Sequence, residues 1–314
     1  MFLGIDTSCY TTSLAVVDTQ GRLLSDRRQL LKVPAGERGL RQSDGVFQHL
    51  QNIPLLAAQL KEDIGAFELK AIGVSRSPRP LPESYMPVFV AGLSYAKTIA
   101  DILAVPCCEL SHQEGHILAG AWSAKVDWEE FYALHVSGGT TELLLVNLSD
   151  GIKINQLGGS SDLHAGQFID RVGVALGLPF PAGPALEKLA QHAGGSQIKV
   201  PVAVKGLSLS FSGPESFVQR LLQTEKIEPA VVARGLEQCI AESLRRLIDN
   251  AVLRYGKKPV LFVGGVMANH YIRQYLTQTL NLECNFAQAN YAGDNAVGAA
   301  LYALYKTKLL QTAD

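Results

Sequence analysis

The chain has 314 residues, 47% of them hydrophobic, which is enough for a globular core and long enough for two domains. Its 28 basic and 29 acidic residues give a formal net charge of −1, which argues against binding of polyanions through overall charge. The five cysteines are odd in number and lack CxxC spacing, which argues against a disulfide framework and favours a reducing compartment. The N-terminus MFLGIDTS does not read as a signal peptide, and no run of about twenty apolar residues is free of charge. We therefore expect a cytoplasmic protein without a membrane anchor.

The first part of the chain alternates predicted strands and helices. Short apolar runs bounded by turn residues predict a three-stranded meander at residues 2–7, 13–18 and 23–29. A helix is expected over 43–63, a strand over 71–75 and a second helix over 87–103. This order is typical of an α/β protein.

The same order then repeats. Strands are expected at 131–136, 142–146 and 152–157, with helices from about Ala165 and Gly183. IDTSCYTTSLAVVD and HVSGGTTELLLVN each contain a strand, a turn rich in glycine, serine or threonine, and an apolar strand. We interpret this as an internal duplication that produces two related lobes.

The last part of the chain is expected to hold a helix over 230–255, a strand over 259–263, and helices over 269–280 and 294–308. We expect an N-terminal lobe over 1–125, a C-terminal lobe over 126–292, and a terminal helix within 293–314 that packs back on the first lobe.

Three turns rich in small residues predict a phosphate-binding site. Two lie at equivalent places in the two halves, at 7–12 and 137–141, and the third is Gly264-Gly265 between a strand and a helix. Such turns expose backbone amides without bulky side chains, and a helix start adds a positive end. Hairpins need glycine in any case, so a structural role for each turn stays open. Together, the three turns favour the actin-like ATPase fold with a nucleotide in the cleft between the lobes.

His112 and His116 are spaced to bind one metal ion. Four residues apart, they share one face of a helix, although two surface histidines would show the same spacing. The residue after His112 is Gln113, so the HExxH general base of a zinc protease is missing. Asp294, at the expected start of the last helix, is the natural third ligand, although its carboxylate could simply favour that helix terminus. A His-His-Asp set leaves coordination positions open.

A basic segment lies near the N-terminus. Six basic residues stand there against Asp26 and Glu37, namely Arg22, Arg27, Arg28, Lys32, Arg38 and Arg41. Such a run indicates either a solvated surface or a local patch for nucleic acid.

Motifs spread in order along almost the whole chain resemble one known family. They are GIDTSCYTTSLAVVD, HQEGHILA, LHVSGGTTELLLV, GLPFPAGPALEKLA, LSFSGPES, VGGVMAN and GDNAVGAAL. The chain resembles the tRNA threonylcarbamoyl-transferases of the TsaD type, formerly called O-sialoglycoprotein endopeptidases or glycoproteases. The family fold is the duplicated actin-like α/β fold (ASKHA). Its members transfer a threonylcarbamoyl group from its AMP anhydride to N6 of the adenosine beside the anticodon, usually with protein partners.

The resemblance implies roles for individual residues. His112, His116 and Asp294 match metal ligands, usually for iron or zinc. The resemblance implies an ATP- or AMP-type nucleotide, which Mg²⁺ could accompany. It also implies tRNA and the proteins of the threonylcarbamoylation system as partners. The positions that match the nucleotide site are His135, Val136, Ser137, Gly138 and Gly139 on the phosphate side, Asp170 at the ribose, Gly183, and Asn269 at the adenine, beside the Gly264-Gly265 turn.

Several substrate-side motifs depart from the family pattern. The first loop, SCDET in the family, has Tyr10 and Thr11 in place of its two acids. GPG is replaced by SPRP at 77–80, SGGHT by SGGTT at 137–141, DDAxGEAFDK by DLHAGQFIDR at 162–171, and SFSGLKT by SFSGPES at 210–216. Two hypotheses follow, with no catalytic residue assigned. One is a metal-dependent threonylcarbamoyl- or carbamoyl-type transferase, whose acceptor is tRNA or another molecule. The other is a diverged non-catalytic ATP-binding regulator or partner.

Overall fold

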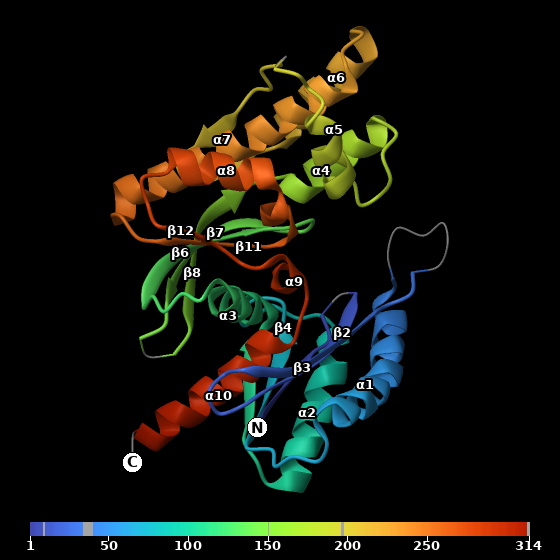
Figure 1. Ribbon diagram of the computed structural model, residues 1–314, viewed down its shortest axis with the longest axis vertical. Helices are drawn as coiled ribbons and strands as arrows, with labels where there is room; N and C mark the ends of the chain where they lie inside the picture. The colour runs from blue at the N-terminus through green and yellow to red at the C-terminus, as the bar shows by residue number, and fades with distance from the viewer. Residues whose placement is uncertain (9, 34–39, 150, 196–197, 313–314) are drawn as a thin grey trace. The chain divides into compact units, whose positions relative to one another are not determined.

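The structure is a computed structural model that describes residues 1–8, 10–33, 40–149, 151–195 and 198–312 (Figure 1). The chain divides into two compact units, one formed by Met1–Ser123 with Gly293–Asp314 and the other by Ala124–Ala292. Three residues considered above, Cys9, Glu37 and Arg38, lie outside the described residues.

The first unit is built on a five-stranded sheet in the order β3-β2-β1-β4-β5. Strand β2 pairs antiparallel with β1 and β3, whereas β4 is parallel to both β1 and β5. The carboxyl ends of β1, β4 and β5 therefore lie at the same edge, where α/β proteins place their ligands. The strands are β1 (Phe2–Asp6), β2 (Thr11–Val17), β3 (Leu23–Leu30), β4 (Ala71–Ser77) and β5 (Cys107–Ser111).

Helices cover both faces of this sheet. Helices α1 (Gln42–Ile64) and α2 (Val88–Leu103) pack on one face, around a core that includes Ile5 and Ile72. Helix α10 (Val297–Thr312) packs on the other face, against Phe2 and neighbouring strands. Successive side chains of a strand point to opposite faces, so β1 directs Ile5 toward α1 and α2 but Phe2, Gly4 and Asp6 toward the α10 face.

Helix α10 lies unusually close to the sheet because glycines face it. A Cβ atom at Gly4 would be 2.1 Å from the carbonyl oxygen of Ala296, and one at Gly73 would be 1.8 Å from that of Ala299. Only residues without a side chain allow this approach. The helix begins at Val297 rather than at Asp294 as the sequence indicated, because Asn295 Oδ1 accepts a hydrogen bond from the Val297 amide (3.0 Å). Asp294 is therefore not part of the helix.

The second unit repeats the topology of the first. Its sheet has the order β12-β11-β6-β7-β8-β10-β9, in which β8-β7-β6-β11-β12 reproduces the order and directions of β3-β2-β1-β4-β5. This repetition confirms the predicted duplicated α/β fold. The strands are β6 (Glu130–Val136), β7 (Thr141–Asn147), β8 (Lys153–Ser160), β9 (Ala203–Lys205), β10 (Ser208–Ser210), β11 (Val260–Val263) and β12 (Cys284–Phe286).

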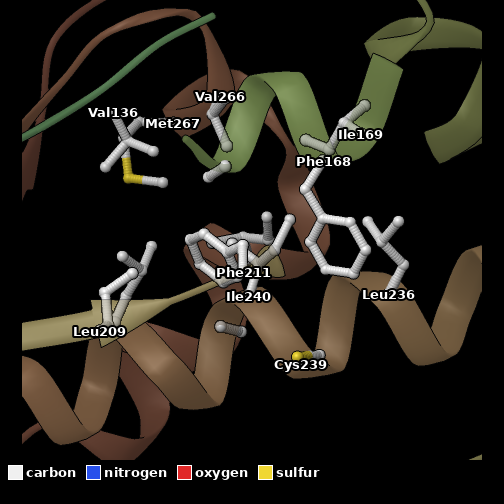
Figure 2. Packing of buried hydrophobic residues seen from close by; sticks show 14 of the residues in the cluster. Val136, Phe168, Ile169, Leu209, Phe211, Leu236, Cys239, Ile240, Val266 and Met267 are labelled. Carbon is white, nitrogen blue, oxygen red and sulfur yellow. The ribbon is translucent and has the colours of Figure 1, made fainter. Parts of the chain in front are cut away.

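A large hydrophobic core joins the helices of the second unit to its sheet. Figure 2 shows Phe168 of α4 beside Phe211, and their stacked rings have centroids 5.6 Å apart. Leu236 and Ile240 of α7 face them from below (Figure 2). The helical elements of this unit are α4 (Ala165–Ala175), α5 (Gly183–Ala190), α6 (Ser212–Thr224), α7 (Pro229–Tyr255), the short 3₁₀ helix η1 (Gly265–Ala268), α8 (His270–Thr279) and α9 (Ala289–Ala292).

The described cysteines, Cys107, Cys108, Cys239 and Cys284, all carry free thiols. Within the described residues, no helix combines the length and the apolar character that a bilayer crossing requires.

Candidate functional site

Three predicted metal ligands come together in the first unit. His112 begins helix α3 (His112–Ala124) directly after β5, and His116 lies one turn later. Their Nε2 atoms are 2.9 Å apart, and Asp294 Oδ1 lies 3.3 Å from each of them. Ligand atoms about 2.1 Å from one ion, at angles between those of an octahedron and a tetrahedron, stand roughly 3.0–3.4 Å apart. The donor set and its spacing therefore fit a single metal ion.

The electrostatics of this cluster favour positive charge at its centre. Burial raises the pKa of Asp294, but hydrogen bonds from the two histidines outweigh it and hold that pKa below its ordinary value. Burial lowers the pKa of His112, but the carboxylates of Asp6 and Asp294 outweigh it and raise that pKa well above its ordinary value. Burial and the neighbouring His112 lower the pKa of His116, which keeps a lone pair available on its ring.

Asp6 is a further member of the cluster that sequence reasoning did not identify. It ends β1, its side chain is buried, and its Oδ2 lies 2.9 Å from Nδ1 of His112. The same oxygen accepts a hydrogen bond from Ser75 Oγ (2.5 Å). Its Oδ1 accepts bonds from the amide (2.9 Å) and the hydroxyl (2.5 Å) of Ser8. Asp6 thus joins the ends of the parallel strands to the imidazole of His112.

Glu114, between the two histidines, is engaged elsewhere. Its Oε2 accepts hydrogen bonds from the amide and the hydroxyl of Ser111, each 2.6 Å long. The carboxylate is held at the start of α3 by these bonds, so the structure gives it a capping role.

The turn at Ser137–Gly139 lies in the second unit at the N-terminus of α4. Ser137 donates its amide to the carbonyl of Thr140 (2.8 Å) and accepts at its own carbonyl from the Gly166 amide (3.2 Å). A Cβ atom at Gly138 or Gly139 would meet nothing within 4 Å, so this side of the turn is open. The first two amides of α4 already have partners, because Ala165 donates to Thr141 Oγ1 (2.9 Å) and Gly166 to the Ser137 carbonyl. An anion such as phosphate would therefore be held by the open glycine turn itself.

The other residues predicted for the phosphate side lie at the end of β6, directly before this turn, and at the end of β11. His135 and Val136 are buried at the end of β6. Gly264 has a φ of 100°, and a Cβ atom there would lie 2.2 Å from the Val136 carbonyl oxygen, so β11 ends tightly against β6. Gly265 begins η1, and a Cβ atom there would meet nothing within 4 Å.

Asp170, Gly183 and Asn269 lie on helices of the same unit. Asp170 Oδ1 accepts a hydrogen bond from the amide of Ala182 (2.7 Å), the residue before Gly183, which begins α5. Asn269 caps α8, because its Oδ1 accepts from the Ile272 amide (2.9 Å). The side-chain oxygen of Asn269 is therefore committed to the helix, and the Nδ2 group is the one that could also reach a ligand.

Glu237 holds that Nδ2 group. It accepts a hydrogen bond from Asn269 Nδ2 (2.6 Å) and from Nη1 of Arg234 (2.6 Å). Its side chain is 1% exposed, and burial raises the pKa of Glu237 to about 7 despite the bond from Asn269 and the charge of Arg234. Arg234 in turn lies over the ring of Tyr271, 4.1 Å from its centroid. No sequence pattern singled out Glu237 or Arg234.

The substituted first loop carries no carboxylate at the two described positions where the family has acids. Tyr10 is 44% exposed, whereas Thr11 is buried at the start of β2. The hydroxyl oxygen of Thr12, the next residue, lies 2.8 Å from Nδ1 of the buried His49. Any acid-dependent step would have to use another residue.

Three arginines of the basic segment are paired with nearby carboxylates. Arg22 bonds Asp18 (2.6 Å), Arg27 bonds Asp63, and Arg28 bonds Asp26 (2.5 Å). Much of the positive charge in the described part of this segment is thus balanced locally, which agrees better with a solvated surface than with a patch for nucleic acid.

Comparison with known proteins relates the whole chain to one family. Residues 44–301 match the sequence profile of TsaD, tRNA N6-adenosine threonylcarbamoyltransferase. A tRNA N6-adenosine threonylcarbamoyltransferase of Sulfurihydrogenibium sp. is 32% identical, over 97% of this chain and 89% of that protein. The corresponding protein of Christiangramia forsetii is 33% identical, over 98% of this chain and 93% of that protein.

The fold is shared more widely. A ROK family glucokinase from Streptomyces griseus, solved in complex with glucose and AMPPNP, superimposes with a TM-score of 0.54. The alignment covers 96% of this chain and 98% of that chain at 12% identity, a level that speaks for the fold alone. The architecture is the actin-like ASKHA fold, as the sequence predicted, and by its sequence the chain belongs to the TsaD family of tRNA N6-adenosine threonylcarbamoyltransferases.

Proposed function

We propose that this protein is a metal- and adenine-nucleotide-binding transferase that moves a threonylcarbamoyl group from its AMP anhydride to N6 of the adenosine beside the anticodon of tRNA. The observation that carries the proposal is the convergence of His112, His116 and Asp294 on one point. It occurs in a chain that aligns over 97% of its length with a threonylcarbamoyltransferase.

The metal centre would be held by the two Nε2 atoms and the Asp294 carboxylate, with iron or zinc as the ion. When bound, the ion supplies a Lewis acid and a template at its open coordination positions. The chain's own contribution is to keep these three donors in fixed positions. Burial keeps His116 neutral by lowering its pKa, and β5 and α3 place both imidazoles at the sheet edge.

The nucleotide would bind on the second unit. Its phosphates would lie against the open side of the Ser137–Gly139 turn. Asp170 would contact the ribose, and Asn269 would offer its remaining Nδ2 hydrogen to the adenine. A Mg²⁺ ion could accompany an ATP-type ligand there. The support for this placement is the arrangement of glycines and amides in the turn.

We further propose that tRNA is bound with the help of protein partners of the threonylcarbamoylation system. The net charge of −1 provides no general attraction for a polyanion, and the arginines at 22, 27 and 28 are already paired. A purely regulatory role is not favoured, because the family is one of transferases.

The test is a transfer assay with a nucleoside readout. The metal-loaded protein is incubated with threonylcarbamoyl-AMP, an unmodified tRNA that has adenosine beside its anticodon, and an extract that supplies partner proteins but lacks its own transferase. Digestion of the tRNA and mass spectrometry should then detect N6-threonylcarbamoyladenosine.

The His112→Ala variant is the matched control, because it removes a metal donor and should abolish the product. If the wild-type protein has its metal bound and is folded, yet forms no modified nucleoside, transfer to tRNA is contradicted. Replacing tRNA by free adenosine in a parallel reaction shows whether the acceptor is a small molecule instead.

A further inference from the structure

We infer that Asp6 is the positioning residue of the metal centre: its carboxylate accepts a hydrogen bond from Nδ1–H of His112 and thereby leaves Nε2 of that ring unprotonated and aimed at the ion. The inference rests on the metal centre proposed above and adds a residue that takes no part in coordination itself.

The geometry at His112 assigns different tasks to the two ring nitrogens. Nε2 faces His116 Nε2 at 2.9 Å and Asp294 Oδ1 at 3.3 Å, which are the other donors. Nδ1 faces Asp6 Oδ2 at 2.9 Å. A histidine that binds a metal through one ring nitrogen keeps a proton only on the other, so a carboxylate at Nδ1 favours the tautomer that coordinates through Nε2 once an ion displaces the Nε2 proton.

Asp6 is not placed to be a fourth ligand. A carboxylate offers about four lone-pair directions, and Asp6 has four hydrogen-bond contacts. Ser8 provides two donors to Oδ1, while Ser75 and His112 share Oδ2. Every acceptor position is thus used within the protein, and the side chain is only 1% exposed.

The fold explains why this carboxylate can be so well fixed. Asp6 lies at the end of β1, Ser75 lies on β4, and His112 follows the end of β5, and these three strands are parallel neighbours. The bonds from Ser75 and from the backbone of Ser8 therefore hold Asp6 from two directions. A rotation of His112 would break its bond to Asp6 in a buried place, which is costly.

The experiment uses cobalt(II) as the probe ion, because its visible absorption reports the ligand set. The metal-free full-length protein is titrated with cobalt, and affinity is measured by competition with a chelator. We expect Asp6→Asn to lower the affinity roughly 10- to 100-fold and to change the absorption bands. Asp6→Glu, which keeps a carboxylate, should recover much of the affinity.

Asp18→Asn is the matched control. Asp18 belongs to the same unit and accepts backbone hydrogen bonds in a turn, from Gln20 and Arg22, but does not contact the histidines. Its variant should bind cobalt like the wild type. Circular dichroism of each metal-free variant shows whether it is folded.

A second measurement on the wild-type protein does not depend on any variant. In the zinc-loaded protein, long-range proton–nitrogen correlation spectra should show His112 protonated at Nδ1 and without a proton at Nε2. A proton at Nε2 would overturn the inference. So would a folded Asp6→Asn variant that binds cobalt with the affinity and the spectrum of the wild type. Both results would leave the metal centre itself standing. Failure of the wild type to bind cobalt or zinc would instead remove the metal centre itself.

Discussion

Gly298 of α10 lies so close to Gly115 of α3 that a Cβ atom on Gly298 would be 1.9 Å from the carbonyl oxygen of Gly115. Gly115 stands between His112 and His116 in the sequence, and Gly298 follows Asp294 by four residues. This crossing of two helices therefore brings the late carboxylate to the imidazole pair. The geometry of the candidate metal centre depends on the absence of a single methyl group.

Gly298→Ala should therefore separate α10 from α3. The added Cβ meets backbone rather than a flexible side chain, so the helices must move, and we expect a loss of about 3 kcal/mol in the free energy of unfolding. Metal affinity should fall on the order of tenfold or more, because the Asp294 oxygen shifts away from the histidines. Denaturant unfolding and a chelator competition measure the two effects.

Gly293→Ala is the control for this prediction. A Cβ atom at Gly293, the residue next to Asp294, would meet nothing within 4 Å. Its stability and metal affinity should stay close to the wild type, and an equal loss in both variants would show that helix contact is not the cause.

Two glycines at or beside the turn proposed to bind phosphate should respond differently to a methyl group. At Gly166 a Cβ atom would lie 2.6 Å from the Ser137 carbonyl oxygen, whereas at Gly139 it would lie in open space. Gly166→Ala should thus lower both stability, by about 2 kcal/mol, and nucleotide affinity. Gly139→Ala should keep the stability and lower only the affinity, because the methyl group occupies the place of the ligand. Calorimetric titration with ATP, alongside thermal unfolding, distinguishes the two patterns, and unaltered ATP affinity in both variants would count against this turn as the phosphate site.

The fold was predictable where the signal is local. The strands of the two meanders are short runs bounded by turn residues, so β1 to β3 and β6 to β8 were expected close to their observed bounds. Strand β5 was not expected, because the alternation in CCELS covers only four residues, and the three-residue strands β9 and β10 are too short to show a pattern. Helix α6 was also missed.

The candidate site was also predictable only in part. The spacing of His112 and His116 can be read along one helix, and Asp294 was predicted as the third ligand from its place near an expected helix start, a role that the family resemblance also implied. Asp6 is 106 residues from His112 in sequence, and only the parallel pairing of β1, β4 and β5 brings the two together. Asp294 was expected at a helix start, but Asn295 provides the side-chain bond to the first amide of α10, which leaves Asp294 outside the helix.

Asn269 should affect stability as well as nucleotide binding. Its Oδ1 caps α8, so Asn269→Ala should lower the free energy of unfolding by about 1 kcal/mol from the lost cap and more because Oε1 of Glu237 loses its donor. Asn269→Ser keeps a capping oxygen and should recover the part of the unfolding free energy that the cap contributes. Urea unfolding of both variants measures the difference, and identical stabilities would mean that the cap contributes nothing.

Glu237 should make stability fall as the pH rises. Its pKa is raised from 4.5 to about 7 in the folded protein by burial, so between these values the folded state binds more protons than the unfolded state. The free energy of unfolding should be highest below pH 4.5. It should decline as the pH rises from there through about 7, by up to about 3 kcal/mol in total. Glu237→Gln removes this contribution. The difference in unfolding free energy between about pH 5 and about pH 8 should be smaller for this variant than for the wild type. Equal pH slopes in the two proteins would contradict the role of Glu237.

The central claim is that one ion is bound by His112, His116 and Asp294, and the metal content of the purified protein tests it most directly. Mass spectrometry of the elements, after loading with iron or zinc and removal of loosely bound ions, should find about one ion per wild-type chain. The double variant His112→Ala with His116→Ala, folded by circular dichroism, should contain almost none. The same metal content in both proteins, or none in the wild type, would contradict the account.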